Sequence, residues 1–161
     1  MRVIDNFLPD YQFNKLSSFL MGDTFPWFYN DSIVKKKDGL SQFTHTFYDT
    51  RSYWNGGTVY FSDIIEPILC NFNLTKLHRV KSNMRLKSWF KRGSGYHRDI
   101  GNVTTAILYI NTNNGYTKFK KGGKVKSVAN RVVIFDSNLE HMGCTCTNDK
   151  RRIVVNFNYD R

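Results

Sequence analysis

The second half of the chain constrains the fold most, because it is a series of short strand-like segments separated by turns. After an alternating segment near residues 80–90, the expected strands cover 103–111, 115–120, 124–127, 131–136 and 151–159. Short, closely spaced strands that follow two helical segments fit a barrel of the jelly-roll type. The pattern therefore predicts a mainly β protein.

Two helical segments are expected before these strands. Phe13, Leu16, Phe19 and Leu20 repeat at helical spacing, with Asp10 placed as a possible N-cap. A second helix is expected within residues 62–72, either starting near residue 66 or bending there, because Pro67 is awkward inside a straight helix. We expect both helices to pack on one sheet of the barrel.

Length and composition predict one domain, residues 1–161. The sequence has no run of eighteen apolar residues, so no transmembrane helix is expected. Its N-terminus has no apolar signal core, so export is not expected. Cys70, Cys144 and Cys146 cannot all pair within the chain, which favours a reducing, cytoplasmic setting.

Aromatic residues are frequent between Phe25 and Trp54, and a tight turn is expected at residues 55–57. The aromatic side chains favour core packing, although aromatics interleaved with lysines could also stack on bases. His45 lies in an alternating strand there and is expected to be a structural histidine.

The short motif His97-Arg98-Asp99 is the first sign of chemistry. Side chains two residues apart in an extended strand point to the same side, so His97 and Asp99 would lie together. A distant His141 would complete two nitrogen ligands and one carboxylate. This set leaves one face of an octahedral ion open, which suits non-haem Fe(II) oxygenases.

Four further stretches extend this motif to a family resemblance: 107–111 resembles a "LYLN" strand, 115–119 a "GGxTxF" strand, 132–143 an "F-x-S…H" stretch, and 151–157 a closing strand. Over residues 84–160 the chain resembles the Fe(II)/2-oxoglutarate-dependent dioxygenases, in particular the small prolyl-4-hydroxylase-like branch. The compact build and the stretch 43–48 are similar to versions carried by bacteriophages.

The resemblance implies a double-stranded β-helix, a jelly-roll or cupin-like barrel with N-terminal helices on one sheet. It further implies that residues 1–80 form a scaffold with substrate-side loops and that 81–161 form the catalytic core. His97, Asp99 and His141 would hold Fe(II), with 2-oxoglutarate as cosubstrate and ascorbate as reductant. Tyr109 and Thr117 would contact the cosubstrate, as would Trp89, which stands where the family often has a tyrosine.

Strand parity selects the residue that would bind the distal carboxylate of 2-oxoglutarate. Arg152 shares its face with Asn156 and Asn158, whereas Arg151 shares its face with apolar residues, so Arg152 is predicted. An arginine fork matches a carboxylate with two hydrogen bonds. The same parity places mixed side chains of the strand 103–111 on the pocket wall. The candidates for supporting or substrate contacts are therefore Asn156, Asn158, Thr105 and Ile107.

The expected reaction is hydroxylation of a C–H bond, foremost of a prolyl residue in a peptide or protein, in the cytoplasm of a bacterium or phage-infected host. The same chemistry on a nucleic acid base or a small amino acid stays open. A net charge of +11 also permits a non-catalytic nucleic-acid-binding module, although it fits solubility or attraction of the dianionic cosubstrate equally well. A cupin-like isomerase is a further alternative, and the oligomeric state is left open.

Overall fold

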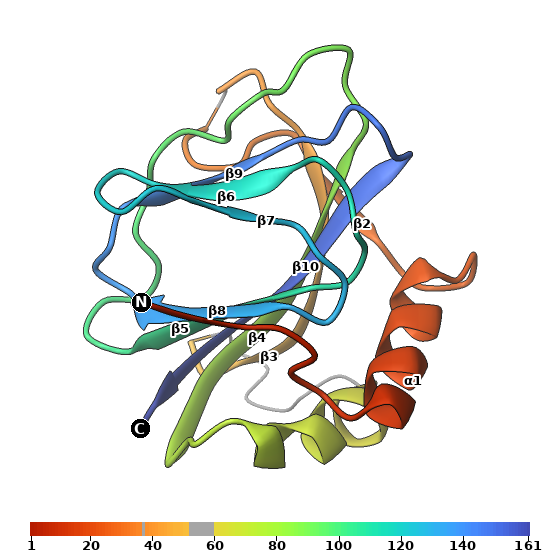
Figure 1. Ribbon diagram of the computed structural model, residues 1–161, viewed down its shortest axis with the longest axis vertical. Coiled ribbons are helices and arrows are strands. Elements are labelled where there is room, and N and C mark those ends of the chain that lie inside the picture. The colour runs from red at the N-terminus through yellow and green to blue at the C-terminus, as the bar shows by residue number, and fades with distance from the viewer. Residues whose placement is uncertain (37, 52–59) are drawn as a thin grey trace.

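The computed structural model, which describes residues 1–36, 38–51 and 60–161, contains a seven-stranded and a three-stranded antiparallel sheet that face each other (Figure 1). The large sheet has the order β1-β8-β5-β10-β4-β3-β2 and the small one β7-β6-β9. The strands are β1 (Arg2–Ile4), β2 (Phe28–Asn30), β3 (Gln42–Asp49), β4 (Lys76–Leu86), β5 (Thr104–Tyr109), β6 (Tyr116–Phe119), β7 (Lys124–Lys126), β8 (Val132–Asp136), β9 (His141–Cys144) and β10 (Arg151–Asp160). The turn expected at residues 55–57, together with Tyr53 and Trp54, lies outside the described residues.

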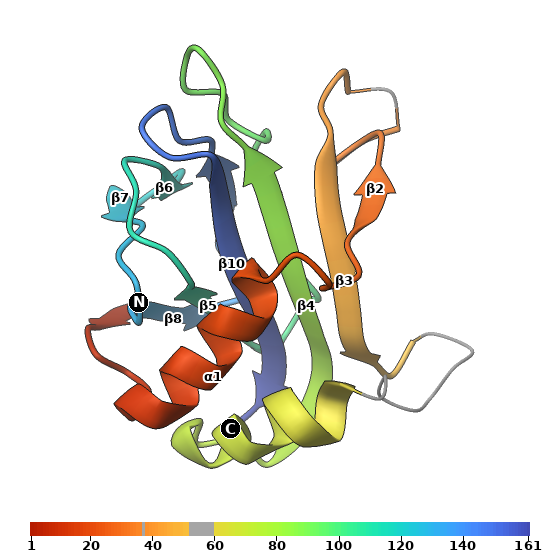
Figure 2. The same ribbon diagram turned by 90° about the vertical axis from the view of Figure 1, so that its right-hand side faces the viewer.

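The helices cover the outer face of the large sheet, as Figure 2 shows for α1 (Asp10–Met21). The second helical segment is in two parts, a π-helical turn η1 (Phe61–Ile65) and a 3₁₀ segment η2 (Glu66–Asn71), so the chain changes helix type just before Pro67. Buried side chains of these helices share one core with the outward-facing residues of β4, β5, β8 and β10. The predicted mainly β fold with helices on one sheet is confirmed.

The N-cap expectation for Asp10 is wrong by one residue. Pro9 is the N-cap, with ψ of 142°, and its carbonyl accepts the first helical hydrogen bond from Phe13. Asp10 is therefore already inside the first turn and makes no side-chain cap. Its carboxylate still lies at the positive end of the helix dipole, where a negative charge is favourable.

A smaller apolar core lies between the two sheets. It joins residues of β5, β8 and β10 to Phe119 of β6 and Val125 of β7. On β5 the parity is as expected: Ile107 and Tyr109 belong to this inner core, whereas Ala106 and Leu108 belong to the outer one. Beyond β10, the inner face of β4 is polar and lines a cavity instead.

No helix within the described parts of the chain combines the length and the apolar character that a membrane crossing requires.

Candidate metal centre

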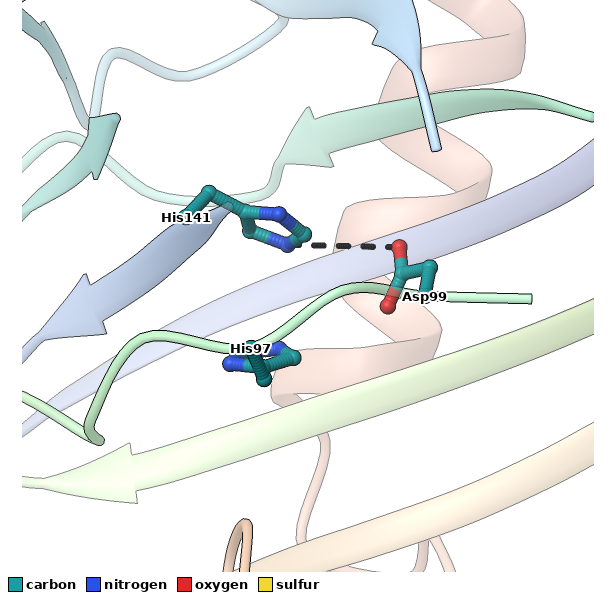
Figure 3. Close-up of side chains that lie close together, drawn as sticks. All are labelled: His97, Asp99 and His141. Atoms are coloured by element: carbon teal, nitrogen blue, oxygen red, sulfur yellow. Dashed lines mark ion pairs between the residues drawn. The ribbon is translucent and has the colours of Figure 1, made fainter. Parts of the chain in front are cut away.

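His97, Asp99 and His141 converge at the rim between the two sheets (Figure 3). One potential ligand atom from each residue lies within 4.8 Å of the others, and Nε2 of His141 is 3.9 Å from Oδ2 of Asp99. The side chains of Asp99 and His141 are only 5% and 3% exposed. Two imidazoles and a carboxylate at this spacing are the donor set of a facial metal site.

Backbone hydrogen bonds, not a continuous strand, hold the two histidines side by side. His141 begins β9, while His97 belongs to a segment that meets β9 through an isolated bridge. The N–H of each residue donates to the carbonyl of the other at 3.0 Å. The extended strand expected around His97 is thus reduced to a bridge, but the two-residue spacing still places Asp99 beside the histidines.

Both imidazole rings are oriented by a carbonyl two residues earlier in the chain. Nδ1 of His97 is 3.2 Å from the Gly95 carbonyl, and Nδ1 of His141 is 3.0 Å from that of Leu139. With Nδ1–H donating, each Nε2 keeps a free lone pair, the usual arrangement of metal-binding histidines. Burial lowers the pKa of His141, against the opposing charge of Asp99, and so favours the neutral ring that a metal needs. The residues therefore fit a divalent metal.

Asp99 is held by a polar network from β5, β10 and β4. Thr105 donates a hydrogen bond to its Oδ2 at 3.1 Å, and Asn158 donates to the Thr105 hydroxyl at 3.0 Å. Arg79 donates to Oδ1 of Asn158 at 3.0 Å and lies 3.7 Å from Oδ1 of Asp99. Thr105 and Asn158 were expected near the site, but Arg79 was not. Its role depends on the pairing of Arg79 with Asn158 between β4 and β10, which no short motif signals.

Arg152 lies buried at the inner end of the same cavity, on the face that parity predicted. It is 4% exposed and donates to Ser127 at 2.8 Å and to the Thr117 hydroxyl at 3.1 Å. Within the described part of the chain, no carboxylate pairs with it. Arg151 points to the opposite face, where it donates to the carbonyl of Met21.

The Thr117 hydroxyl is oriented by its neighbours. It accepts hydrogen bonds from Tyr109 at 2.8 Å and from Arg152 at 3.1 Å. A hydroxyl has two acceptor sites and one proton, so with both acceptor sites occupied its own proton is left to donate. That proton and the guanidinium of Arg152 together form a donor pair suited to a carboxylate.

A cavity of about 340 Å³ connects the metal centre with Arg152. Of the other predicted site residues, Ile107, Thr117 and Asn156 line it, whereas Tyr109, Thr105 and Asn158 are buried behind its wall. Ile33 and Val34 close one side in a loop whose backbone N–H groups donate to the Asp38 carboxylate. These hydrogen bonds lower the pKa of Asp38 to about 2.

Trp89 does not fit its expected role. Its side chain is 95% exposed and does not line the cavity. Because β4 ends at Leu86, strand parity no longer applies to Trp89; the turn that follows is instead fixed by Ser88, which bonds Phe90 and Thr145. We therefore no longer expect Trp89 to contact a cosubstrate.

His45 is buried away from the cavity. It is 4% exposed, its Nδ1 is 3.0 Å from the Pro26 carbonyl, and its ring packs on Phe25 and Phe47. These contacts agree with a structural role.

Gly115 allows Arg152 to reach its position, so Gly115→Ala is expected to be costly. An added Cβ would lie 2.7 Å from Cδ of Arg152 and 2.9 Å from the Cys144 carbonyl. Overpacking of this kind typically costs about 1–3 kcal/mol. We expect a loss of this size in urea unfolding and weaker 2-oxoglutarate binding. Gly101→Ala is the control, because its Cβ would meet no atom closer than 3.8 Å. Equal unfolding free energies and equal 2-oxoglutarate affinities in the two variants would contradict the prediction.

Comparison with known proteins places this geometry in a known fold. No protein family model and no curated protein matches the sequence. Among solved structures, a 2OG-Fe(II) oxygenase family oxidoreductase from Burkholderia pseudomallei aligns with a TM-score of 0.73 over 98% of this chain and 84% of its own, at 9% identity. The chain has the fold of the 2-oxoglutarate/Fe(II) oxygenases.

Two further structures carry the same fold. An alpha-ketoglutarate-dependent carbocyclase from nogalamycin biosynthesis aligns with a TM-score of 0.68 over 98% of this chain and 78% of its own, at 10% identity. A Pseudomonas putida prolyl-4-hydroxylase aligns with a TM-score of 0.59 over 99% of this chain and 92% of its own, at 14% identity. The predicted jelly-roll barrel is thus confirmed, while likeness at such identity does not fix a reaction.

Proposed function

We propose that the protein is an Fe(II)- and 2-oxoglutarate-dependent oxygenase. The observation that carries the proposal is that one cavity is lined by two histidines and a carboxylate with clustered ligand atoms, and also by a buried arginine without a carboxylate partner among the described residues. The first group suits a metal and the second an organic anion. Burying an arginine without a carboxylate partner is costly, which favours an anionic ligand at this place.

In this proposal each residue has a defined task. His97, Asp99 and His141 would hold Fe(II), and Thr105 with Asn158 would keep the Asp99 carboxylate turned toward it. When bound, iron and 2-oxoglutarate supply the oxidation of a substrate C–H bond by oxygen, with ascorbate as reductant. Arg152 and the Thr117 proton would bind the distal carboxylate, while Tyr109 orients Thr117 from behind.

The substrate proposed first is a prolyl residue of a peptide or protein. The sequence resemblance to the prolyl-4-hydroxylase-like branch supports it, and so does the fold shared with the Pseudomonas putida protein. The carbocyclase shares the fold as well, so the fold does not fix the substrate. Hydroxylation of a nucleic acid base or small amino acid is therefore kept as the second candidate. The proposed setting is the cytoplasm of a bacterium or of a phage-infected host.

Succinate formation from 2-oxoglutarate tests the proposed function. With Fe(II) and ascorbate, the wild type should produce succinate, more so with its substrate, and a chelator should abolish this. His97→Ala should reduce the rate by about 100-fold or more, since losing a direct ligand should exceed the 10–100-fold cost of losing a supporting contact. His78→Ala, at a β4 histidine that does not line the cavity, should keep the rate.

Two results would reject the proposal. One is a rate that does not depend on iron or on His97. The other is a metal-loaded wild type that neither forms succinate nor binds 2-oxoglutarate. That result would favour a basic nucleic-acid-binding module.

A further inference from the structure

The cavity wall formed by β4 is more basic than a metal and 2-oxoglutarate require. Alternate residues of this strand all line the cavity: Arg79, Lys81, Asn83 and Arg85. Around the whole cavity the described lining has six basic side chains and one acidic side chain, Asp99. The basic ones are Arg51, Arg79, Lys81, Arg85, Arg98 and Arg152.

These charges stay unbalanced when the site is filled. The two charges of Fe(II) and of the 2-oxoglutarate dianion cancel. Asp99 offsets one of the six basic residues, and Asp49, outside the lining, offsets Arg51. Burial, followed by the charge of Arg152, lowers the pKa of Arg85 to about 10. Like charges gathered in a cleft repel one another and concentrate anions there, so an anionic ligand would be favoured.

Most of the cations already have a task. Arg152 faces the proposed cosubstrate site, and Arg79 bonds Asn158 beside Asp99. Arg85 donates to two backbone carbonyls, and the half-exposed Arg51 pairs with Asp49.

The side chains of Lys81 and Arg98 have no hydrogen bond or ion pair within the described part of the chain. Arg98 is exposed, whereas Lys81 is half-buried. Burial, followed by the charge of Arg79, lowers the pKa of Lys81, against the opposing charges of Asp49 and Asp99. Its ammonium has three donors that need a partner.

The neighbours of Lys81 complete a polar site. Lys81 pairs with Asn156 of β10 on one side and with Thr46 of β3 on the other. The side-chain oxygen of Asn156 is buried without a partner in the described residues and can accept from the Lys81 ammonium. The NH2 group of Asn156 makes no hydrogen bond within the described residues, so it can donate to an anion. Asn83, one step along the same face, adds a second amide to the cavity wall.

This site is separate from the cosubstrate anchor. Arg152 pairs across the strands with Arg85, four residues along β4 from Lys81. At a strand rise of about 3.3 Å per residue, the two positions lie roughly 13 Å apart along the sheet. The metal centre, reached through Asp99 and Arg79, lies at the Lys81 end of this row.

We infer that the substrate carries an oxyanion, a carboxylate or a phosphate, which binds Lys81 between Asn83 and Asn156. The inference rests on the proposed function, since it names the substrate of that site. A cavity of about 340 Å³ must also hold the cosubstrate, so the oxyanion belongs close to the oxidised carbon. A neutral prolyl residue alone would leave Lys81 unpaired.

Anion binding to the filled site tests this inference. The protein is saturated with Zn(II) and 2-oxoglutarate, and methyl phosphate or acetate is titrated by NMR. We expect saturable binding of at least one anion that is about tenfold or more weaker in Lys81→Met. Lys81→Arg should recover most of the affinity, because it keeps the charge. Lys118→Met, an exposed lysine of β6 outside the cavity, should behave as wild type.

The outcomes separate the sources of the anion. Binding of methyl phosphate alone supports a phosphorylated substrate or nucleic acid, and binding of acetate alone supports an acidic amino acid or peptide. No saturable binding, or binding that Lys81→Met leaves intact because the metal holds the anion, would overturn the inference. If 2-oxoglutarate fails to bind but Lys81 still controls the affinity for an anion, the proposed function fails and the oxyanion site stands.

Discussion

Arg152→Met is expected to weaken 2-oxoglutarate binding about 100-fold or more without destabilising the metal-free protein. Truncating one partner of a buried, hydrogen-bonded charge pair costs about 2–5 kcal/mol, and every 1.4 kcal/mol is tenfold in affinity. In the ligand-free chain the same guanidinium is a buried charge without a carboxylate partner among the described residues. Replacing it by an apolar side chain of similar length removes a desolvation cost.

Calorimetric titration of 2-oxoglutarate into the Zn(II)-loaded protein, together with urea unfolding of the metal-free protein, measures both effects. Arg151→Met is the matched control, because Arg151 lies on the opposite face of β10 and bonds Met21. Arg152→Lys should be intermediate, since an ammonium keeps the charge but not the two-pronged contact. Unchanged binding in Arg152→Met, or a loss in Arg151→Met, would place the cosubstrate elsewhere.

Asp99→Asn is expected to abolish the stabilisation that a divalent metal gives to the fold. A metal that binds only the folded state stabilises it by about 2.7 kcal/mol at a hundred times its Kd. For a domain of this size each kcal/mol raises Tm by about 2–4 °C, so the wild type should gain roughly 5–10 °C with Mn(II). The amide keeps the shape of Asp99 but not the charge of the third ligand.

Calorimetric scans with and without Mn(II) measure this gain. Asp63→Asn, at an exposed residue of η1, is the control and should retain the full metal-dependent rise. A similar rise in Asp99→Asn would mean that the carboxylate is not a ligand. The metal-free variant should still fold, because the side-chain oxygen of the new asparagine can accept the hydrogen bonds that Thr105 and Asn158 donate to Asp99.

Local sequence patterns could predict the parts of the site that depend on strand parity. The two-residue spacing of His97 and Asp99, and the choice of Arg152 over Arg151, need only the alternation of side chains. The fold class likewise follows from the short strands after residue 100. The N-cap at Pro9 was missed because Asp10 has a side chain that N-cap positions favour, whereas Pro9 has none that could cap the helix.

The rest depends on which strands become neighbours. Arg79 reaches Asp99 because β4 pairs with β10 in a register that aligns it with Asn158. No spacing rule connects residues that are so distant in the chain. Trp89 shows the opposite limit: its expected role rested on the family resemblance, and the strand that would have carried it toward the cavity ends at Leu86.

The reciprocal backbone hydrogen bonds between His97 and His141 also bear on how the proposed metal would be taken up. The main chain and the carbonyls of Gly95 and Leu139 contribute to the alignment of the two rings. If the proposed metal binds here, we expect the metal-free chain to fold first. Metal uptake would then be limited by access through the cavity rather than by the folding of the chain.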